Sequence, residues 1–407
     1  MHTNNTIKLL KLQGKNIKID KEVINDKNNT ATFFISKKII ESSCPCCKSK
    51  TRRIHDYRLQ KIKHSPLNGY KTTLILKKVR LLCTNCGKKF YMNYNDIVTP
   101  KFRSSNELFN KIIEDLQNTS CTFKEVAKLN FVSSGVVTRY LKFFTYLMQW
   151  ENITTLPKHI GIDEFKGNCD DSKYLFHIYD LDTSQTVYIL RTRKYYDLLE
   201  FFNTIQNRNE VEIVTMDLYD TFRNAIKAKF KNATIIADRF HYTRIVAKAM
   251  DELRREIWRK SSGDQKKYCK HLKLSLLKDI EKVSSSYIIH HEAKLNSAFD
   301  LSAKLKYGYQ LYQSFLRIKD GDTFEEKCKR FSDWLSDAES STIKEFKSAA
   351  ETLLRWSKEI VNSFKYTYTN SSTEGKNNKI KVIKRTSYGF RNLANFRARI
   401  KLRDIKV

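Results

Sequence analysis

The sequence predicts an α/β chain of several domains, with a mixed-sheet core, an all-α insertion in that core, and two small modules ahead of it. Three observations predict this class. Two C-x-x-C pairs stand within the first hundred residues, apolar strands that end in aspartate alternate with helical segments from about residue 157, and residues 250–365 contain no proline. A chain of 407 residues is also longer than one hydrophobic core usually supports, so we expect two to four domains.

The charge of the chain predicts a polyanionic partner. There are 76 Lys and Arg against 44 Asp and Glu, which gives a formal net charge of +32. Residues 1–100 carry 21 basic and 6 acidic side chains, and residues 375–407 carry 11 basic side chains and one acid, Asp404. A lysine-rich surface from a compositionally biased genome is the plain alternative. Because the charge is concentrated at the two ends, we favour nucleic acid as the partner.

We divide the N-terminal part into a basic segment, residues 1–40, and a metal-binding module, residues 41–100. In the module, Cys44 and Cys47 form one C-x-x-C pair, and Cys83 and Cys86 form the other. Two thiolates at this spacing can face one tetrahedral ion, so paired knuckles indicate a structural Zn²⁺ site. A redox pair is the main alternative, but a thioredoxin-like context is missing. Five further cysteines are expected to stay outside the site, as follows: Cys46, Cys121, Cys169, Cys269 and Cys328.

Residues 101–150 predict a helix-turn-helix. An amphipathic helix spans 106–116, a capping box at Thr122 and Glu125 opens a short helix through residue 129, and Ser133 can cap a third helix to about Tyr146. An ordinary helical hairpin is the alternative. Beside a zinc module and a large positive charge we favour DNA binding, with the last helix in the major groove. The candidate DNA contacts on this helix are Ser134, Thr138, Arg139 and Lys142.

Residues 157–250 predict the first part of a catalytic core. Strands are expected at 160–165, 174–179, 186–190, 211–216 and 233–237, and helices at 195–205, at 220–230 and from about 240. Three strands joined by hairpins and followed by alternating helices and strands give the element order of a ribonuclease-H-like fold. In that order the first and fourth strands are neighbours at the centre of the sheet. Asp163 and Asp217 would therefore meet at its edge.

A third acid is expected from beyond the fifth strand. Glu374 opens a strongly basic segment, and three carboxylates would suit Mg²⁺ or Mn²⁺, with two ions about 3.5–4 Å apart. Capping is the alternative for each acid. Asp217 could cap a turn or helix, Glu374 fits a capping box with Ser371, and Asp238 could cap the helix after the fifth strand.

Residues 251–364 predict an all-α insertion, which would either brace DNA or position Glu374. Residues 365–407 are assigned to the last part of the core, with a basic C-terminal helix. The cations of this segment that we expect to contact DNA are Lys376, Lys379, Lys381, Lys384, Arg385 and Arg391.

Four motifs resemble the ISL3 family of bacterial insertion-sequence transposases. They are Gly161-Ile-Asp-Glu-Phe165, Ala237-Asp-Arg-Phe-His241, Thr373-Glu-Gly-x-Asn-Asn-Lys-Ile-Lys381 and Tyr388-Gly-Phe-Arg-Asn392. The resemblance extends from about residue 40 to 401. It implies that Asp163, Asp217 and Glu374 form a metal-binding catalytic triad and that the N-terminal modules bind terminal inverted repeats.

The resemblance implies a DDE transposase that cleaves DNA and transfers strands with two metal ions. Its expected partners are double-stranded DNA, both inverted repeats and target, and further copies of itself in a homodimer or higher oligomer. No apolar run approaches the length of a membrane span, so we expect a cytoplasmic, nucleoid-associated bacterial protein without a membrane partner. A transposase-derived DNA-binding protein with a silent core and a structure-selective nuclease are the alternatives.

Overall fold

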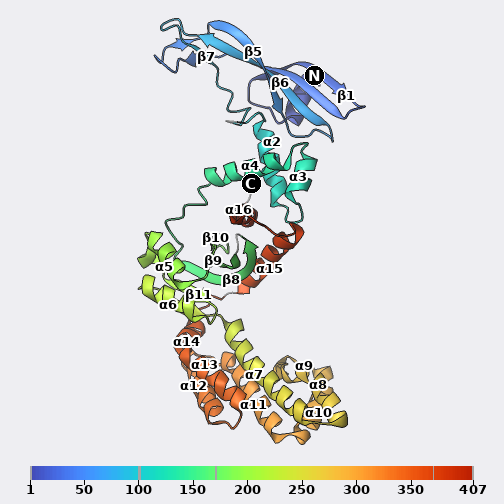
Figure 1. Ribbon diagram of the computed structural model, residues 1–407, viewed down its shortest axis with the longest axis vertical. Helices are drawn as coiled ribbons and strands as arrows, with labels where there is room; N and C mark the ends of the chain where they lie inside the picture. Colours follow the sequence, from blue (N-terminus) through green and yellow to red (C-terminus); the bar gives the residue numbers. More distant parts are fainter. Residues whose placement is uncertain (1, 100–101, 170–171, 370, 406–407) are drawn as a thin grey trace. The chain divides into compact units, whose positions relative to one another are not determined.

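A computed structural model of the chain describes residues 2–99, 102–169, 172–369 and 371–405 (Figure 1). Within helix α15, the side chains of residues 371–374, 376 and 377 lie outside this description. The chain divides into two compact units, one of Met1–Asn152 with Lys379–Val407 and the other of Ile153–Asn378. Within the described ranges, no helix is both long and apolar enough to cross a membrane.

The N-terminal part of the first unit is a five-stranded sheet in the order β1-β2-β6-β5, with β7 paired to β6. Its elements are α1 (His2–Leu9), β1 (Ile17–Asn25), β2 (Thr30–Lys37), β5 (Ile54–Lys63), β6 (Lys71–Leu82) and β7 (Lys89–Tyr91), and β3 (Ser42–Ser43) pairs with β4 (Lys50–Thr51) beside it. Strands β2 and β6 are parallel, whereas β5 and β7 pair antiparallel with β6. The strand predicted at 71–82 is confirmed. Residues 1–40, which we expected only as a basic segment, supply two strands of this sheet.

Alternation of apolar and polar side chains explains how the sheet forms a core. In β2 and β6, Phe33, Ile35, Leu74 and Leu76 are buried, while the residues between them are more exposed. Ile62 of β5 pairs with Leu74 and is also buried. Successive side chains of a strand point to opposite faces, so this pattern gives the sheet one apolar face and one solvated face.

Helices α2 (Asn106–Gln117), α3 (Phe123–Leu129) and α4 (Ser134–Leu147) follow within one or two residues of their predicted bounds. The capping box is present, because the Glu125 amide donates to Thr122 Oγ1 at 3.2 Å and the Thr122 amide donates to Glu125 Oε2 at 2.6 Å. Ser133 occupies the N-cap position of α4, but its side chain makes no capping hydrogen bond.

The C-terminal helix α16 (Leu393–Asp404) packs against these three helices. Ala398 and Leu402 belong to their apolar core. The Gln117 side chain donates to the carbonyl of Ile405 at 2.7 Å, and the Arg399 guanidinium donates to the carbonyl of Cys121 at 2.8 Å. From the sequence we expected residues 365–407 to form the last part of the catalytic core. In the structure the contacts of residues 379–407 place them in the first unit instead.

The second unit contains a mixed sheet in the order β10-β9-β8-β11-β12. Its strands are β8 (His159–Cys169), β9 (Ser172–Asp180), β10 (Thr186–Leu190), β11 (Ile213–Met216) and β12 (Thr234–Ala237). The first three strands are antiparallel, and β11 lies parallel between β8 and β12. All five predicted strands are therefore present, and the first and fourth are neighbours as expected.

Helices pack on this sheet and share one hydrophobic core with the insertion. The helices between and after the strands are α5 (Tyr195–Thr204), η1 (Arg208–Glu210), α6 (Asp220–Lys229) and α7 (Arg239–Lys260). The insertion continues with α8 (Gly263–His271), α9 (Lys273–Leu276), η2 (Ile280–Lys282), α10 (Ser285–Leu301), α11 (Ala303–Arg317), η3 (Ile318–Asp320), α12 (Phe324–Ser340), α13 (Lys344–Arg355) and α14 (Ser357–Lys365). It returns to the sheet through α14, where Asn362 Nδ2 donates to the carbonyl of Ile235 in β12 at 2.7 Å.

Gly161 in β8 packs so closely against Tyr179 that it leaves no room for a side chain. It pairs with the fully buried Tyr179 of β9, and a Cβ atom at this position would lie 1.9 Å from Tyr179 Cζ. Gly161→Ala should therefore lower the free energy of unfolding by about 1–3 kcal/mol in chemical denaturation. Tyr179→Leu in the Gly161→Ala background should restore part of the loss, because it removes the clashing ring. Gly135→Ala, whose Cβ would meet only Ser133 Oγ at 3.8 Å, is the control and should cost nothing. Equal losses in the two alanine variants would contradict the constraint.

Candidate active site and zinc centre

Four cysteines form the first candidate site. Their sulfur atoms all lie within 4.8 Å of one another, and the pairs Cys44–Cys86 and Cys47–Cys83 are 3.6 and 3.5 Å apart. Four sulfurs that surround Zn²⁺ at about 2.3 Å in a tetrahedron are separated by about 3.8 Å. The observed spacing therefore fits a structural zinc ion, as the sequence predicted for these residues.

The two knuckles have the same backbone geometry. In the first knuckle, the Cys44 amide donates to the Ser49 carbonyl and the Lys48 amide donates to the Cys44 carbonyl. In the second, the Cys83 amide donates to the Lys88 carbonyl and the Gly87 amide donates to the Cys83 carbonyl. The fourth residue after each first cysteine has a left-handed backbone, with φ of +62° at Lys48 and +69° at Gly87. Each loop thus turns both of its thiols toward the same point.

The neighbouring groups favour thiolates in the first knuckle. Hydrogen bonds from the side chain and backbone of Ser49 lower the pKa of Cys47 to about 5. Thiolate is the form that binds metal. Cys46 is exposed and lies outside the four-sulfur cluster. The remaining cysteines are buried or half-buried elsewhere in the fold, as expected.

Strand register builds the second candidate site from three aspartates. Ile162 of β8 and Ala237 of β12 are both paired with Met216 of β11. Asp163 is the next residue of β8, and Asp217 and Asp238 directly follow the last residues of β11 and β12. Because the three strands are parallel, the side chains meet at the carboxyl edge of the sheet. The backbone amide of Asp238 also donates to the Met216 carbonyl at 2.8 Å, which holds the second strand pair together at this edge.

The electrostatics of this edge show crowded negative charge. Burial raises the pKa of Asp217 to about 8, and the negative charges of Asp163 and Asp238 and a hydrogen bond with Asp163 add to the effect. Carboxylates that raise one another's pKa in this way form a site that a cation would stabilise. Oxygen ligands of this kind suit Mg²⁺ or Mn²⁺.

His241 adds a nitrogen to the aspartate cluster. Its Nε2 lies 3.2 Å from Asp217 Oδ1 and 3.8 Å from Asp238 Oδ2. The candidate ligand atoms of Asp217, Asp238 and His241 all lie within 4.8 Å of one another. Burial and the charge of Arg244 lower the pKa of His241, so the ring is held neutral and can bind a metal through nitrogen.

Helix capping does not explain the two acids that follow β11 and β12. Helix α6 begins at Asp220 with Tyr219 in the N-cap position, so Asp217 is not its cap. Asp238 does occupy the N-cap position of α7, but its side chain makes no capping hydrogen bond. From the sequence we expected Asp238 only as a helix cap. The pattern that pointed to Asp217, an apolar strand that ends directly before an aspartate, also occurs at Asp238.

Glu164 provides a further acid beside the cluster. Its carboxylate accepts a hydrogen bond from Arg193 Nη1 at 2.5 Å, and its amide donates to Asp163 Oδ1 at 2.6 Å. The Arg193 guanidinium lies over the ring of Tyr174 at 4.1 Å. Arg193 therefore neutralises Glu164 at the side of the aspartate cluster.

The third predicted acid, Glu374, belongs to helix α15 (Ser371–Thr386), but its side chain lies outside the described residues, as does that of Lys376. The other predicted cations of the C-terminal segment are described. Lys379, Lys381, Arg385 and Arg391 are exposed, and Lys384 is half-buried.

The predicted contacts of α4 lie on its solvent-accessible side. Ser134, Arg139 and Lys142 are exposed, whereas Thr138 is half-buried and donates its hydroxyl to the Ser134 carbonyl at 3.1 Å. The opposite face of the helix is buried through Val137, Tyr140 and Leu141.

The zinc centre can be tested by metal content. Cys44→Ser should remove the metal, because three thiolates with one hydroxyl bind Zn²⁺ more weakly than four thiolates. Purified wild-type protein should release about one zinc ion per chain to a chromogenic chelator when its thiols are blocked, and Cys44→Ser should release almost none. The matched control is Cys46→Ser, which should release as much as wild type. Full zinc content in Cys44→Ser would remove Cys44 from the ligand set.

Asp217→Asn should change the pH dependence of stability. The pKa of Asp217 is about 8 in the fold, against about 3.9 in an unfolded chain. Between these values the folded protein binds more protons than the unfolded chain, so stability is fully present at acid pH and is lost as pH rises toward 8. In EDTA, Asp217→Asn should therefore melt a few degrees above wild type at pH 8, with the difference shrinking toward pH 5.

The same melts in Mg²⁺ provide the counterpart. Magnesium should raise the Tm of wild type at pH 8 and leave Asp217→Asn nearly unchanged. Parallel melting curves of the two proteins at every pH would show that Asp217 carries no excess proton.

Two family models match the chain. The family model of the ISL3 DDE transposases, described as Transposase, matches residues 160–400. A second model, described as zinc-finger of transposase IS204/IS1001/IS1096/IS1165, matches residues 41–86. The chain is 21% identical over 405 residues to the Transposase for insertion sequence element IS1001 of Bordetella parapertussis, with 92% of each chain covered.

A shorter similarity involves a protein named ATP-dependent protease from Lactococcus lactis subsp. lactis. The two chains are 36% identical over 105 residues, which cover 25% of this chain and 31% of that protein. Such a partial match assigns no family. The first family model alone spans more than half of the 407 residues, from the start of β8 into α16. The chain therefore belongs to the ISL3 family of transposases and is a DNA transposase, an enzyme that cuts nucleic acid.

Proposed function

We propose that this transposase cuts and joins DNA at the carboxylate edge of β8, β11 and β12, after its first unit has bound the terminal inverted repeats of an insertion sequence. The in-register meeting of Asp163, Asp217 and Asp238, with the raised pKa of Asp217, is the observation that carries the proposal. The crowded edge has the ligand chemistry that divalent-cation phosphoryl transfer requires.

Asp163 and Asp217 are the residues of this edge that we assign to metal binding, with Glu374 as the third. Two bound Mg²⁺ or Mn²⁺ ions would activate the attacking hydroxyl and stabilise the leaving oxygen. The backbone amide of Glu164 donates a hydrogen bond to Asp163 and fixes its carboxylate. Asp217 is held in position because Met216, the residue before it, pairs with both β8 and β12. Asp238 and His241 lie close enough to orient Asp217 or to complete its metal coordination. The nucleophile is water in the first step and a DNA 3′-hydroxyl in the second.

The strand order supports a ribonuclease-H-like core. Three antiparallel strands, followed by β11 and β12 parallel to the first of them, give the order β10-β9-β8-β11-β12. In this order the first and fourth strands are neighbours, as we expected of that fold from the sequence. This order brings the acids of the first and fourth strands together without any help from the insertion.

We assign α3 and α4 to a helix-turn-helix that contacts duplex DNA. The turn between them is tight, and Phe131 within it has a left-handed backbone with φ of +50°. Arg139 and Lys142 project from the exposed side of α4, where major-groove readout would place them. The cations of residues 379–391 supply further phosphate contacts. Because an insertion sequence has two ends, we propose that a homodimer or higher oligomer of the protein binds both ends together.

Separating binding from cleavage tests this proposal. Asp163→Asn should abolish Mg²⁺-dependent nicking and joining of a duplex that carries the inverted repeats flanking the gene, while its affinity in gel shifts stays at the wild-type level. Arg139→Ala tests DNA binding instead of cleavage. It should weaken binding of the same duplex by about tenfold or more, the effect of losing one specific contact. Asp333→Asn, an exposed aspartate of α12, is the control and should act normally.

Two results would reject parts of the assignment. Normal cleavage by Asp163→Asn would remove the catalytic role of the aspartate edge. Wild-type protein that binds the repeats without cutting them in Mg²⁺ or Mn²⁺ would favour a DNA-binding regulator, and nicking of branched DNA without the repeats would favour a structure-selective nuclease.

A further inference from the structure

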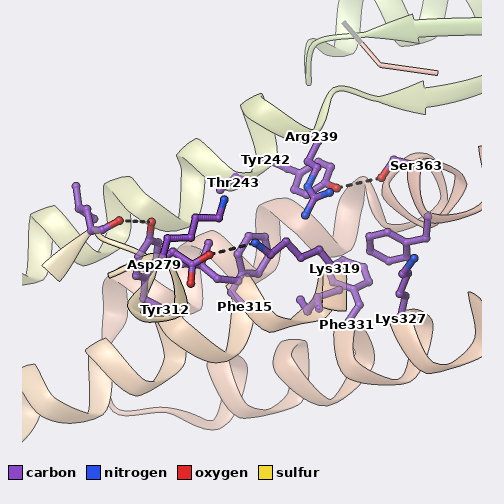
Figure 2. Close-up of a pocket in the computed structure, with 15 residues that line it drawn as sticks. Arg239, Tyr242, Thr243, Asp279, Tyr312, Phe315, Lys319, Lys327, Phe331 and Ser363 are labelled. Atoms are coloured by element: carbon purple, nitrogen blue, oxygen red, sulfur yellow. Dashed lines mark hydrogen bonds and ion pairs between the residues drawn. The ribbon is translucent and has the colours of Figure 1, made fainter. Parts of the chain in front are cut away.

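A cavity of about 420 Å³ lies in the second unit, between the first turns of α7 and the helical insertion (Figure 2). Its size falls within the range of about 300–1,000 Å³ that is typical of small-molecule and cofactor sites. Helices α11, α12 and α14 and the segment around Asp279 provide the other walls. The described residues that line it include none from the cysteine cluster or the aspartate edge.

Aromatic rings form much of the wall. Tyr242, Phe315 and Phe331 are buried, and the Tyr242 and Phe315 rings meet edge to face with centroids 6.3 Å apart. Tyr242 and Ser363 share a hydrogen bond of 3.1 Å, and the Tyr312 hydroxyl donates to the Leu277 carbonyl at 3.1 Å. Because these contacts hold the rings in place, the cavity offers fixed apolar surfaces to a planar ligand.

Cations surround this aromatic wall. Arg239, Lys282 and Lys327 line the cavity, and none of them makes a hydrogen bond or ion pair through its side chain with the residues that the structure describes. Asp279 is the one acidic residue among the described lining residues. It is already paired with Arg317 and with Lys319, whose Nζ lies 3.1 Å away, and it does not neutralise the other three. The cavity therefore carries unpaired positive charge.

The cavity begins next to the aspartate edge. Arg239 directly follows Asp238, and His241, which contacts Asp217 at 3.2 Å, stands on the same first turn of α7 as Tyr242. One helical turn advances about 5.4 Å, so Tyr242 lies close to the residues of that edge. Figure 2 shows Arg239 projecting from this turn beside Tyr242 and Ser363, with Lys327 near Phe331 across the cavity.

We propose that this cavity receives one unpaired nucleotide of the DNA strand whose adjacent phosphate lies at the aspartate edge. The base packs against Tyr242 and Phe331, and Arg239 and Lys327 bind its sugar–phosphate backbone. A purely apolar ligand would leave the cations without partners, and a simple anion would leave the aromatic wall without one. A nucleotide satisfies both, since every base has a face that stacks on aromatic rings. The inference rests on the proposed function, because it assumes that DNA is cut at this edge.

The test measures binding of a short single strand to the full-length protein. The probe is a trinucleotide with 2-aminopurine as its central base, whose fluorescence falls on stacking, in EDTA and with excess unlabelled duplex to occupy other DNA-binding surfaces. Wild-type protein should quench the probe. The double variant Arg239→Ala, Lys327→Ala should bind it about tenfold or more weakly, as expected when two charge-assisted contacts are lost. The control Lys248→Ala, Lys329→Ala changes two cations of the same helices outside the cavity and should bind within about twofold of wild type. Thermal melts should show all variants folded.

Three comparisons can overturn the proposal. An abasic trinucleotide should bind roughly tenfold more weakly than the probe, and equal affinity would mean that the base does not enter the cavity. Free deoxyadenosine monophosphate should bind more weakly than the strand, and equal affinity would indicate a site for free nucleotides. Equal quenching by the double variant and the control would place the probe elsewhere.

The Asp163→Asn variant separates this inference from the proposed function. It should bind the trinucleotide as wild type does, because Asp163 does not line the cavity. Retained quenching with retained cleavage in Asp163→Asn would reject the proposed catalytic edge and leave a nucleotide-binding cavity. Lost cleavage without quenching by wild type would reject the cavity alone.

Discussion

The parallel register of β8, β11 and β12 is the constraint on which the aspartate edge depends. Pairing of Met216 with both Ile162 and Ala237 places three aspartates, far apart in sequence, at the same height on one edge of a sheet. A slip of one residue in any of these strands would turn its aspartate to the opposite face. Buried apolar residues immediately before each aspartate prevent that slip, because they would lose their place in the core. The hydrophobic core thus determines the position of the charged site.

The same register forces an electrostatic conflict that the fold does not relieve by itself. The half-buried Asp217 beside two other carboxylates keeps its proton to about pH 8, whereas Glu164 is neutralised by Arg193. The negative charges of Asp163 and Asp238 therefore act on Asp217. Sites of this kind are destabilising in the absence of a ligand and become favourable when a cation binds. The large hydrophobic core that the sheet shares with the helical insertion offsets this loss of stability at the aspartate edge.

Local patterns predicted much of this structure, and long-range pairing accounts for what they missed. Strands ending in aspartate, the capping box at Thr122 and the two cysteine knuckles are visible within short windows, and each is present. The N-terminal sheet is different, because β2 pairs in parallel with β6 across the first cysteine knuckle and β5. The packing of α16 on α2 joins residues nearly 300 positions apart, as in the hydrogen bond from Gln117 to Ile405. Neither contact leaves a periodic trace in the sequence.

The helical insertion connects these observations. It enters the fold from α7, whose first turn carries His241 at the aspartate edge and Tyr242 in the cavity, and it leaves through α14, which is bonded to β12. Both of its attachments are therefore at the strand that ends in Asp238. A spacer that served only to reach α15 would not need a cationic, aromatic-walled cavity at that junction. The arrangement is better explained if the insertion forms part of the surface that holds the DNA strand, with the sheet supplying the acids and the insertion supplying the contacts next to them.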